Sequence, residues 1–225
     1  MKYIGIDPGC KGGIAVLNQY SIRHIETFSL EKIELSDVAF YFSEMRRQDE
    51  KAIVYLENPS LPPTNIKRES GTGANVQGYT KLYRSLGQLE GICIAFGYIP
   101  ELINPRTWQS RLGVLTGGNK NVTKNEAIKL FPFYAKREGV TRVTHDLADA
   151  LLIALLCYLD HIDPKYIIGE FKHAKYRPST IPKRPRHNDS VATLQGGNTI
   201  NSRSSPPLRS TRPTLDLEQY FNHEV

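Results

Sequence analysis

Four acidic residues are candidates for a catalytic or metal-binding site, because each of them borders an apolar run of the chain. Asp7 follows YIGI, Glu57 follows AIVYL, and Asp149 lies inside ADALLIALL with Asp146 just before it. A carboxylate at the edge of a core must be paired, protonated or bound to a metal, and these segments offer no matching set of Lys or Arg. A hard divalent cation such as Mg²⁺ takes oxygen ligands and leaves positions for phosphates, so it is the natural compensation.

Two of these acids share a helical segment. Asp146 and Asp149 are three residues apart, which places them on one helix face, and His145 stands beside them at the helix start. Each acid also has an ordinary structural explanation. Asp7 can form the turn before Pro-Gly, Glu57 can be solvated, and acids in a first helical turn balance the helix dipole. Their joint placement is what favours a shared site.

Apolar periodicity predicts the elements that must position these residues. We expect strands over 2–7, 12–18, 22–30, 52–58 and 101–105, and helices over 35–48, 75–96, 121–132 and 144–162. Ser36 and Thr144 are the expected N-caps of the first and last helices. The glycines between the first two strands, Gly9, Gly12 and Gly13, are expected to serve a hairpin turn. This order limits the chain to α/β folds with a mixed sheet.

Length and charge divide the chain into a domain and a tail. The 225 residues suit one ordinary domain with a remainder. The formal net charge of +6 is concentrated in 172–213, which hold nine Lys and Arg residues and one acid, Asp189. Because Pro, Ser, Asn and Gly dominate there, we expect a disordered basic linker that either follows a polyanion or only solubilises the chain. The predicted parts are therefore a domain over 1–171, this linker and a short peptide over 214–225.

Composition excludes several classes of protein. No apolar run approaches the roughly 18 residues of a membrane span. The three cysteines, Cys10, Cys93 and Cys157, are too scattered for a disulfide scaffold or a zinc finger. Since the start of the chain lacks a secretory signal, we expect a cytoplasmic protein, in a prokaryotic cell or in a cell infected by a phage or virus.

The acidic residues and their surroundings resemble a known family. The stretches IGIDPGCKGGIAVL, YLEN and HDLADALLIALL look like the four-acid signature of RuvC-type Holliday-junction resolvases, within the ribonuclease H-like superfamily. The resemblance runs over about residues 2–160 and includes GQLEGICIAFGYIPELINPRTWQ. The long Pro-rich segment after Glu57 is closer to phage and viral members than to bacterial ones.

This resemblance implies a fold, an activity and a set of site residues. The implied fold is a ribonuclease H-like mixed β-sheet flanked by helices. The implied activity is that of a crossover junction endodeoxyribonuclease, which cleaves branched DNA with two Mg²⁺ ions, for which Mn²⁺ can substitute. The implied metal ligands are Asp7, Glu57, Asp146 and Asp149, with His145 as an alternative to Asp146, and the implied phosphate-contacting residue is Lys120 or Lys124.

Other functions share parts of this pattern. A ribonuclease H acting on RNA/DNA hybrids uses the same metal chemistry. A non-catalytic DNA-binding module would use only the basic linker. Actin-like sugar kinases open similarly, but they are longer and carry a second glycine-rich phosphate loop that this sequence lacks. Three aromatic residues, Trp108, Tyr79 and Tyr83, are either part of the core or platforms for base stacking.

Two protein partners are predicted from the sequence. Matched cuts on a two-fold substrate favour a homodimer, for which the apolar face of the helix over 76–96 is the predicted interface. Near the C-terminus, Leu217, Tyr220 and Phe221 have the spacing of a sliding-clamp-binding peptide, with Thr214 in place of the usual Gln. A free terminus is the alternative to a clamp contact.

Overall fold

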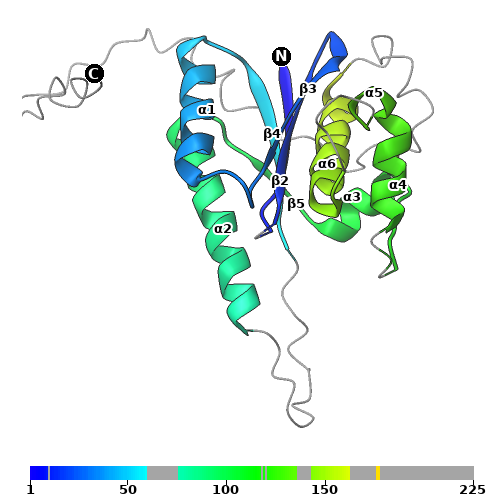
Figure 1. Ribbon diagram of the computed structural model, residues 1–225. Helices are drawn as coiled ribbons and strands as arrows, with labels where there is room; N and C mark the ends of the chain where they lie inside the picture. The colour runs from blue at the N-terminus through cyan, green and yellow to red at the C-terminus, as the bar shows by residue number, and fades with distance from the viewer. Residues whose placement is uncertain are drawn as a thin grey trace, which may run out of the picture. The chain divides into compact units, whose positions relative to one another are not determined.

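The computed structural model shows an α/β fold built on a five-stranded sheet (Figure 1). The residues that the structure describes are 1–9, 11–59, 76–117, 119, 121–135, 143–162 and 176–177. The predicted clamp-binding peptide, and most of the predicted linker, therefore lie outside the described residues.

The sheet has the strand order β3-β2-β1-β4-β5. The strands are β1 (Lys2–Asp7), β2 (Gly13–Asn18), β3 (Ser21–Ser29), β4 (Ala52–Glu57) and β5 (Glu101–Ile103). β2 is antiparallel to β1 and to β3, whereas β4 runs parallel to β1, and β5 runs parallel to β4. Three antiparallel strands continued by two parallel ones make the sheet of the ribonuclease H-like fold, so the predicted fold class is confirmed.

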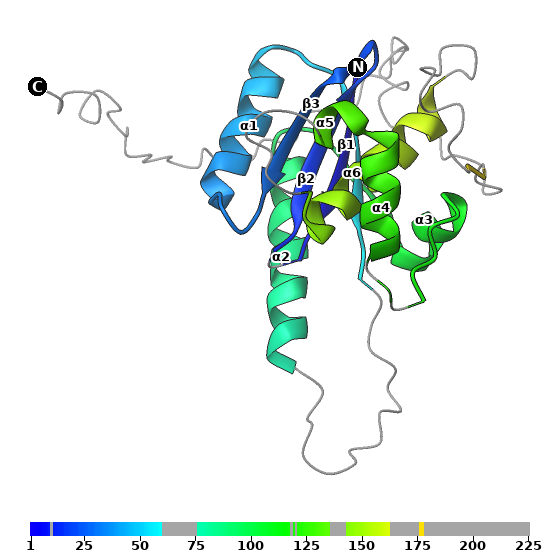
Figure 2. The same cartoon turned by 45° about the vertical axis from the view of Figure 1, so that its right-hand side comes forward.

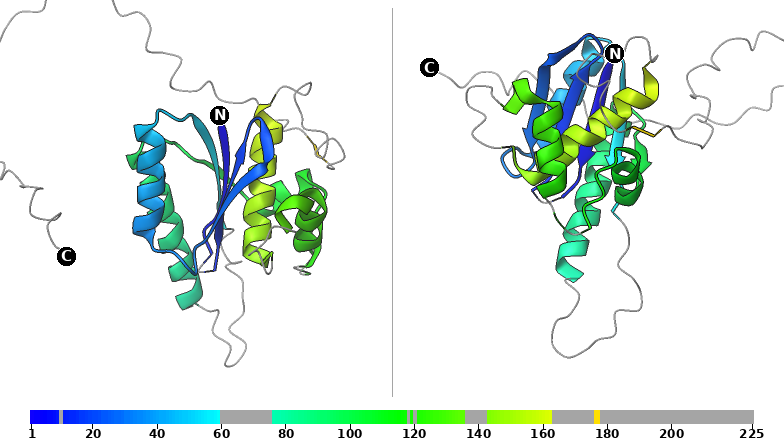
Figure 3. Two further views of the ribbon diagram at one scale, coloured as in Figure 1. Left: turned by 45° about the horizontal axis from the view of Figure 1, so that its top comes forward. Right: turned by 90° about the vertical axis from the view of Figure 1, so that its right-hand side faces the viewer.

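Helices cover both faces of this sheet (Figures 1 and 3). The helices are α1 (Leu35–Arg47), α2 (Val76–Ala95), α3 (Pro105–Arg111), α4 (Asn121–Leu130), α5 (Pro132–Ala135) and α6 (His145–His161). α1 and α2 lie on one face, and α6 lies against the other, with α4 packed on the outer side of α6. The two short helices α3 and α5 were not predicted from the sequence.

Alternation along β1 divides its side chains between two cores. Ile4 and Ile6 lie in the core that the sheet forms with α1 and α2. Tyr3 lies in the core that the sheet forms with α6. Because successive side chains of a strand point to opposite faces, Gly5 and Asp7 share the face of Tyr3. Asp7 is therefore on the α6 side of the sheet.

Two contacts fix the direction in which α6 crosses β1. The rings of Tyr3 and Tyr158 meet edge to face, with their centroids 5.3 Å apart. Further along the strand, a Cβ on Gly5 would lie 2.2 Å from the backbone nitrogen of Ala154 and 2.4 Å from the carbonyl oxygen of Ala150. Only glycine permits so close an approach of helix to strand. The helix thus runs antiparallel to β1, and its first turns lie toward Asp7.

The ends of several elements test the predicted caps and turns. Thr144 is the N-cap of α6, as predicted, and its side chain accepts a hydrogen bond from the Leu147 backbone at 3.3 Å. The prediction of Ser36 as the N-cap of α1 is wrong, because the N-cap is Glu34, two residues earlier. A capping box with Asp37, whose carboxylate accepts from the Glu34 backbone at 2.8 Å, explains this start.

The predicted hairpin turn between β1 and β2 is confirmed. The backbone N–H of Gly12 donates to the carbonyl of Gly9 at 2.7 Å, and Asp7 is paired with Gly13 across the two strands. A Cβ on Gly12 would lie 2.0 Å from the carbonyl oxygen of Asp7. The turn therefore needs a glycine at this point, directly behind the backbone of Asp7.

A buried ion pair holds the far end of α6. Arg111 of α3 pairs with Asp160, which also accepts hydrogen bonds from Tyr55 at 2.7 Å and from Tyr176 at 2.5 Å. Burial opposes the charge of Asp160, but the hydrogen bonds from Arg111 and the two tyrosines hold its pKa below the usual range. The backbone N–H of Arg177 donates to the Arg111 carbonyl oxygen at 2.8 Å, and the Arg177 carbonyl oxygen accepts from Nε of the Arg111 side chain at 3.0 Å. Residues 176–177 of the predicted linker thus pack on the domain.

The apolar face of α2, predicted as a dimer interface, contributes to the intrachain core. Leu86, Leu89 and Cys93 pack in the core with α1 and the sheet. An interface on α2 would therefore have to use other residues of the helix. Cys93 and Cys157 are both buried, and neither forms a disulfide. Within the described ranges, no helix is long and apolar enough to cross a membrane.

Candidate functional site

Asp7 and Glu57 end neighbouring parallel strands. β1 and β4 are paired in register up to Ile6 and Leu56, so the two acids are the next residues of each strand at the same edge of the sheet. Glu57 shares the face of Tyr55, which lies in the core under α6. Both carboxylates are therefore at the carboxyl ends of the strands and on the α6 side, where ligand sites of parallel sheets commonly lie.

Asp149 reaches the same place from α6. It directly precedes Ala150, the residue whose backbone contacts Gly5, and the N-terminal turns of α6 run toward the end of β1. The Oδ1 atom of Asp149 is buried. Besides burial, the negative charges of Asp7 and Asp149 both raise the pKa of Glu57, so the three carboxylates lie within electrostatic range of one another. The structure thus brings together three of the four predicted acids.

Burial and the neighbouring acids change the protonation of Glu57. Burial is the largest cause that raises its pKa, and the nearby charges of Asp7 and Asp149 raise it further, whereas a hydrogen bond from Trp108 lowers it. The result is a pKa of about 8, against an ordinary value of 4.5. Near neutral pH, the carboxyl therefore holds a proton that a bound cation would displace.

Trp108 makes a contact with Glu57 that the sequence did not reveal. Its indole N–H donates to Oε2 of Glu57 at 2.6 Å, and its side chain is fully buried. Of the two alternatives predicted for Trp108, core residue and base-stacking platform, the core residue is therefore confirmed. The available signal was Asn104-Pro105, an N-cap followed by a favoured first helical residue, which predicts a short helix after β5.

Asp7 also has the turn-forming role that the sequence left open. Its Oδ1 accepts a hydrogen bond from the backbone N–H of Gly9 at 3.0 Å. An aspartate that bonds to the backbone two residues later stabilises a local turn. The same bond fixes the orientation of the carboxylate, so the structural and the chemical explanations of Asp7 are compatible.

The remaining predicted residues surround this group without completing it. His145 is the first residue of α6, and Asp146 follows it, with a side chain outside the described part of the structure. Lys124 lies half-buried in the first turns of α4, which packs against α6. Lys120 is also outside the described residues. The structure thus leaves open the choice between His145 and Asp146, and that between Lys120 and Lys124.

The donor chemistry of the group suits a hard cation. Asp7, Glu57 and Asp149 offer carboxylate oxygens alone, which are the ligands that Mg²⁺ and Mn²⁺ prefer. Among the side chains that the structure describes, no set of three or more His, Cys, Asp or Glu residues is arranged closely enough to enclose a metal ion.

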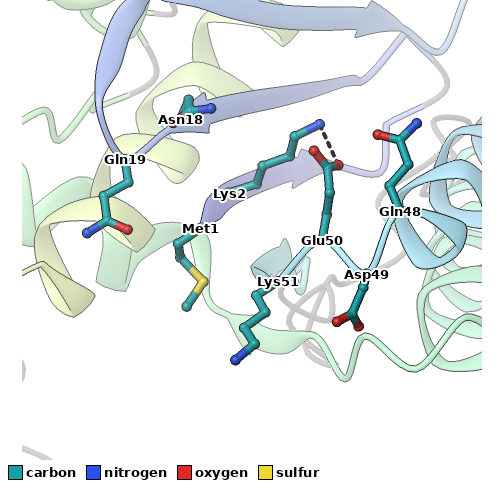
Figure 4. Close-up of a pocket in the computed structure, with 8 residues that line it drawn as sticks. All are labelled: Met1, Lys2, Asn18, Gln19, Gln48, Asp49, Glu50 and Lys51. Carbon is teal, nitrogen blue, oxygen red and sulfur yellow. Dashed lines mark ion pairs between the residues drawn. The ribbon is translucent and has the colours of Figure 1, made fainter.

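A cavity of about 450 Å³ lies elsewhere, at the opposite edge of the sheet (Figure 4). Its lining includes Met1 and Lys2 at the start of β1 and the loop from Gln48 to Lys51 before β4. Lys2 and Glu50 form an ion pair at 2.9 Å across it. Because β1 separates Lys2 from Asp7 by its full length, this cavity does not belong to the carboxylate group.

Comparisons with known proteins give a distant structural likeness only. No family model and no curated protein sequence matches the chain. Two solved structures of Thermus thermophilus RuvC, one of them in complex with a Holliday junction substrate, are each 18% identical over 68% of this chain, with a TM-score of 0.43. The match covers 90% of the chain in the complex and 91% of the other. A likeness at that level does not bear on activity.

Proposed function

We propose that this chain is a metal-dependent endonuclease that cleaves phosphodiester bonds in branched DNA. The observation that carries the proposal is the meeting of Asp7, Glu57 and Asp149 at the carboxyl ends of β1 and β4. These acids come from two strands and a helix, and the charges of Asp7 and Asp149 disfavour ionisation of Glu57. A bound cation would compensate this repulsion, so such a group is a candidate functional site. Crossover junction resolution is the proposed activity, because the surrounding sequence resembles RuvC-type resolvases of the phage and viral kind.

The proposed roles follow from charge. Asp7, at the end of the central strand, would hold Mg²⁺ or Mn²⁺ together with Glu57 and Asp149. Asp146 or His145 would complete the ligand set for two ions. Bound ions supply the activation of water and the stabilisation of the leaving 3′-oxygen. Lys124, or Lys120 before it, contributes positive charge to a substrate phosphate.

Two other functions predict different outcomes for one set of substrates. A ribonuclease H shares the carboxylate chemistry but acts on RNA/DNA hybrids. A non-catalytic module binds DNA without cutting it, although three uncompensated acids near a phosphate backbone oppose such binding. The substrate and the metal together therefore distinguish the three functions.

The test is cleavage by the full-length chain of three labelled substrates of matched sequence: a four-way junction, a flap and an RNA/DNA hybrid. We expect the junction to be cut with Mg²⁺ or Mn²⁺ and to remain intact with EDTA. Faster cutting of the hybrid would favour a ribonuclease H. Binding without cutting in either metal would favour the non-catalytic module.

We also propose two partners that the described residues do not include. A homodimer would place two sites on a two-fold junction and produce paired cuts. A replication clamp is the proposed partner of the C-terminal peptide with Leu217, Tyr220 and Phe221, joined to the domain by the basic linker. Such a tether raises the local concentration of the nuclease on replicating DNA without changing its active site.

A further inference from the structure

We propose that Trp108 is a positioning residue for Glu57, holding this carboxylate in the orientation in which it binds a cation. The inference rests on the metal centre of the proposed function and adds a residue to it. An indole has an N–H donor and no acceptor, so its hydrogen bond with Glu57 has a fixed direction. At 2.6 Å from nitrogen to Oε2, the bond is at the short end for a donor to a carboxylate.

The fold delivers Trp108 to Glu57 by a short and rigid route. Glu57 is paired across the sheet with Ile103 of β5, and the Asn58 backbone donates to the Ile103 carbonyl at 2.8 Å. The side chain of Asn104 then caps α3 by accepting from the Arg106 backbone at 3.0 Å. Only Asn104 therefore separates the end of β5 from the start of α3, which lies beside the end of β4 (Figure 2). Trp108 lies one turn into it.

Packing holds the indole in place once it is there. Trp108 is fully buried in the core under α6. The other end of α3 is held by Arg111, whose guanidinium pairs with Asp160 near the C-terminus of α6. Both ends of the helix are thus tied to elements of the same core. The donor can move little, so the carboxylate that accepts from it is held as well.

A donor that occupies one carboxylate oxygen directs coordination to the other. With Oε2 bonded to Trp108, Oε1 of Glu57 is the atom that we assign to the cation. Partners of this kind orient ligands in metal sites, and removing them typically weakens metal binding by about 10- to 100-fold. Trp108 does not touch substrate in this role, and acts on the reaction through Glu57.

The test measures binding of Mn²⁺ to the full-length chain by electron paramagnetic resonance. Because Trp108 is the chain's single tryptophan, growth on benzothienylalanine replaces only this N–H with sulfur and keeps the shape of the ring. We expect this protein and Trp108→Phe to bind Mn²⁺ about 10-fold more weakly or worse. Thermal melting establishes that each protein is folded at the assay temperature. If Trp108→Phe does not fold, the benzothienylalanine protein alone provides the test.

Tyr55→Phe is the matched control. It removes a different buried hydrogen bond, that to Asp160, from the same strand and the same face as Glu57. We expect it to leave Mn²⁺ affinity unchanged. If the benzothienylalanine protein bound Mn²⁺ with wild-type affinity, the role of Trp108 would be overturned, and the proposed metal centre would not be affected. A wild-type chain that binds no Mn²⁺, or a Glu57→Ala variant that binds it normally, would overturn both.

Discussion

We expect Asp7→Asn to reduce cleavage of a four-way junction by about a thousandfold or more, which corresponds to about 4 kcal/mol of lost transition-state stabilisation. The substitution keeps the size of the side chain and an oxygen that can accept from the Gly9 backbone. It removes the negative charge with which this side chain would hold a cation. Junction binding should persist, because the loss of a negative charge does not weaken attraction to phosphates.

Cleavage is measured under single-turnover conditions, and binding by fluorescence anisotropy of a labelled junction. Asp49→Asn is the matched control. Asp49 is exposed, has a φ of 51° that asparagine tolerates, and lines the cavity at the other edge of the sheet. It should cleave at the natural rate. If Asp7→Asn also cleaved the junction at the wild-type rate, Asp7 would not be an active-site residue.

The second large effect that we expect is a fall in the stability of the metal-free protein as the pH rises through 8. Glu57 has a pKa of about 8 when folded, whereas the unfolded chain gives it an ordinary value near 4.5. Between these values, the folded form holds a proton that the unfolded form has released, so raising the pH favours unfolding. The stabilisation of the folded state by the proton on Glu57 is complete below about pH 4.5 and is lost as the pH rises through about 8.

Glu57→Gln should remove this dependence, because glutamine imitates the protonated acid and still accepts from Trp108. In urea denaturation with EDTA, the free energy of unfolding of the wild type should fall relative to that of the variant by about 3 kcal/mol between pH 6 and pH 9. Added Mg²⁺ should stabilise the wild type more at pH 9 than at pH 6, since it competes with the proton. An equal pH dependence in both proteins would show that Glu57 titrates normally.

The sequence was sufficient for the parts of the site that depend on local pattern. Apolar runs ending at Asp7 and Glu57 predicted two strands, and the Gly-rich turn after Asp7 predicted the hairpin. Thr144 before a long apolar helix predicted the start of α6. Since each of these features is encoded within a few neighbouring residues, periodicity and capping preferences reveal it.

The contacts made across the fold were not predictable in this way. The Trp108–Glu57 bond joins residues 51 positions apart, and the Arg111–Asp160 pair joins residues 49 positions apart. Both depend on α3, a helix of seven residues that is too short to show an amphipathic period. Glu34 was missed for a different reason. Its capping box reverses the usual order, because a Ser, Thr or Asp normally stands at the cap and a Glu follows.

The most direct test of the proposed metal centre is anomalous diffraction from crystals of the full-length protein soaked in Mn²⁺. We expect an anomalous peak beside the carboxylate oxygens of Asp7, Glu57 and Asp149, and the loss of that peak in Asp7→Asn crystals. Mn²⁺ bound only in the cavity beside Lys2 and Glu50, or no peak near the ends of β1 and β4, would contradict it.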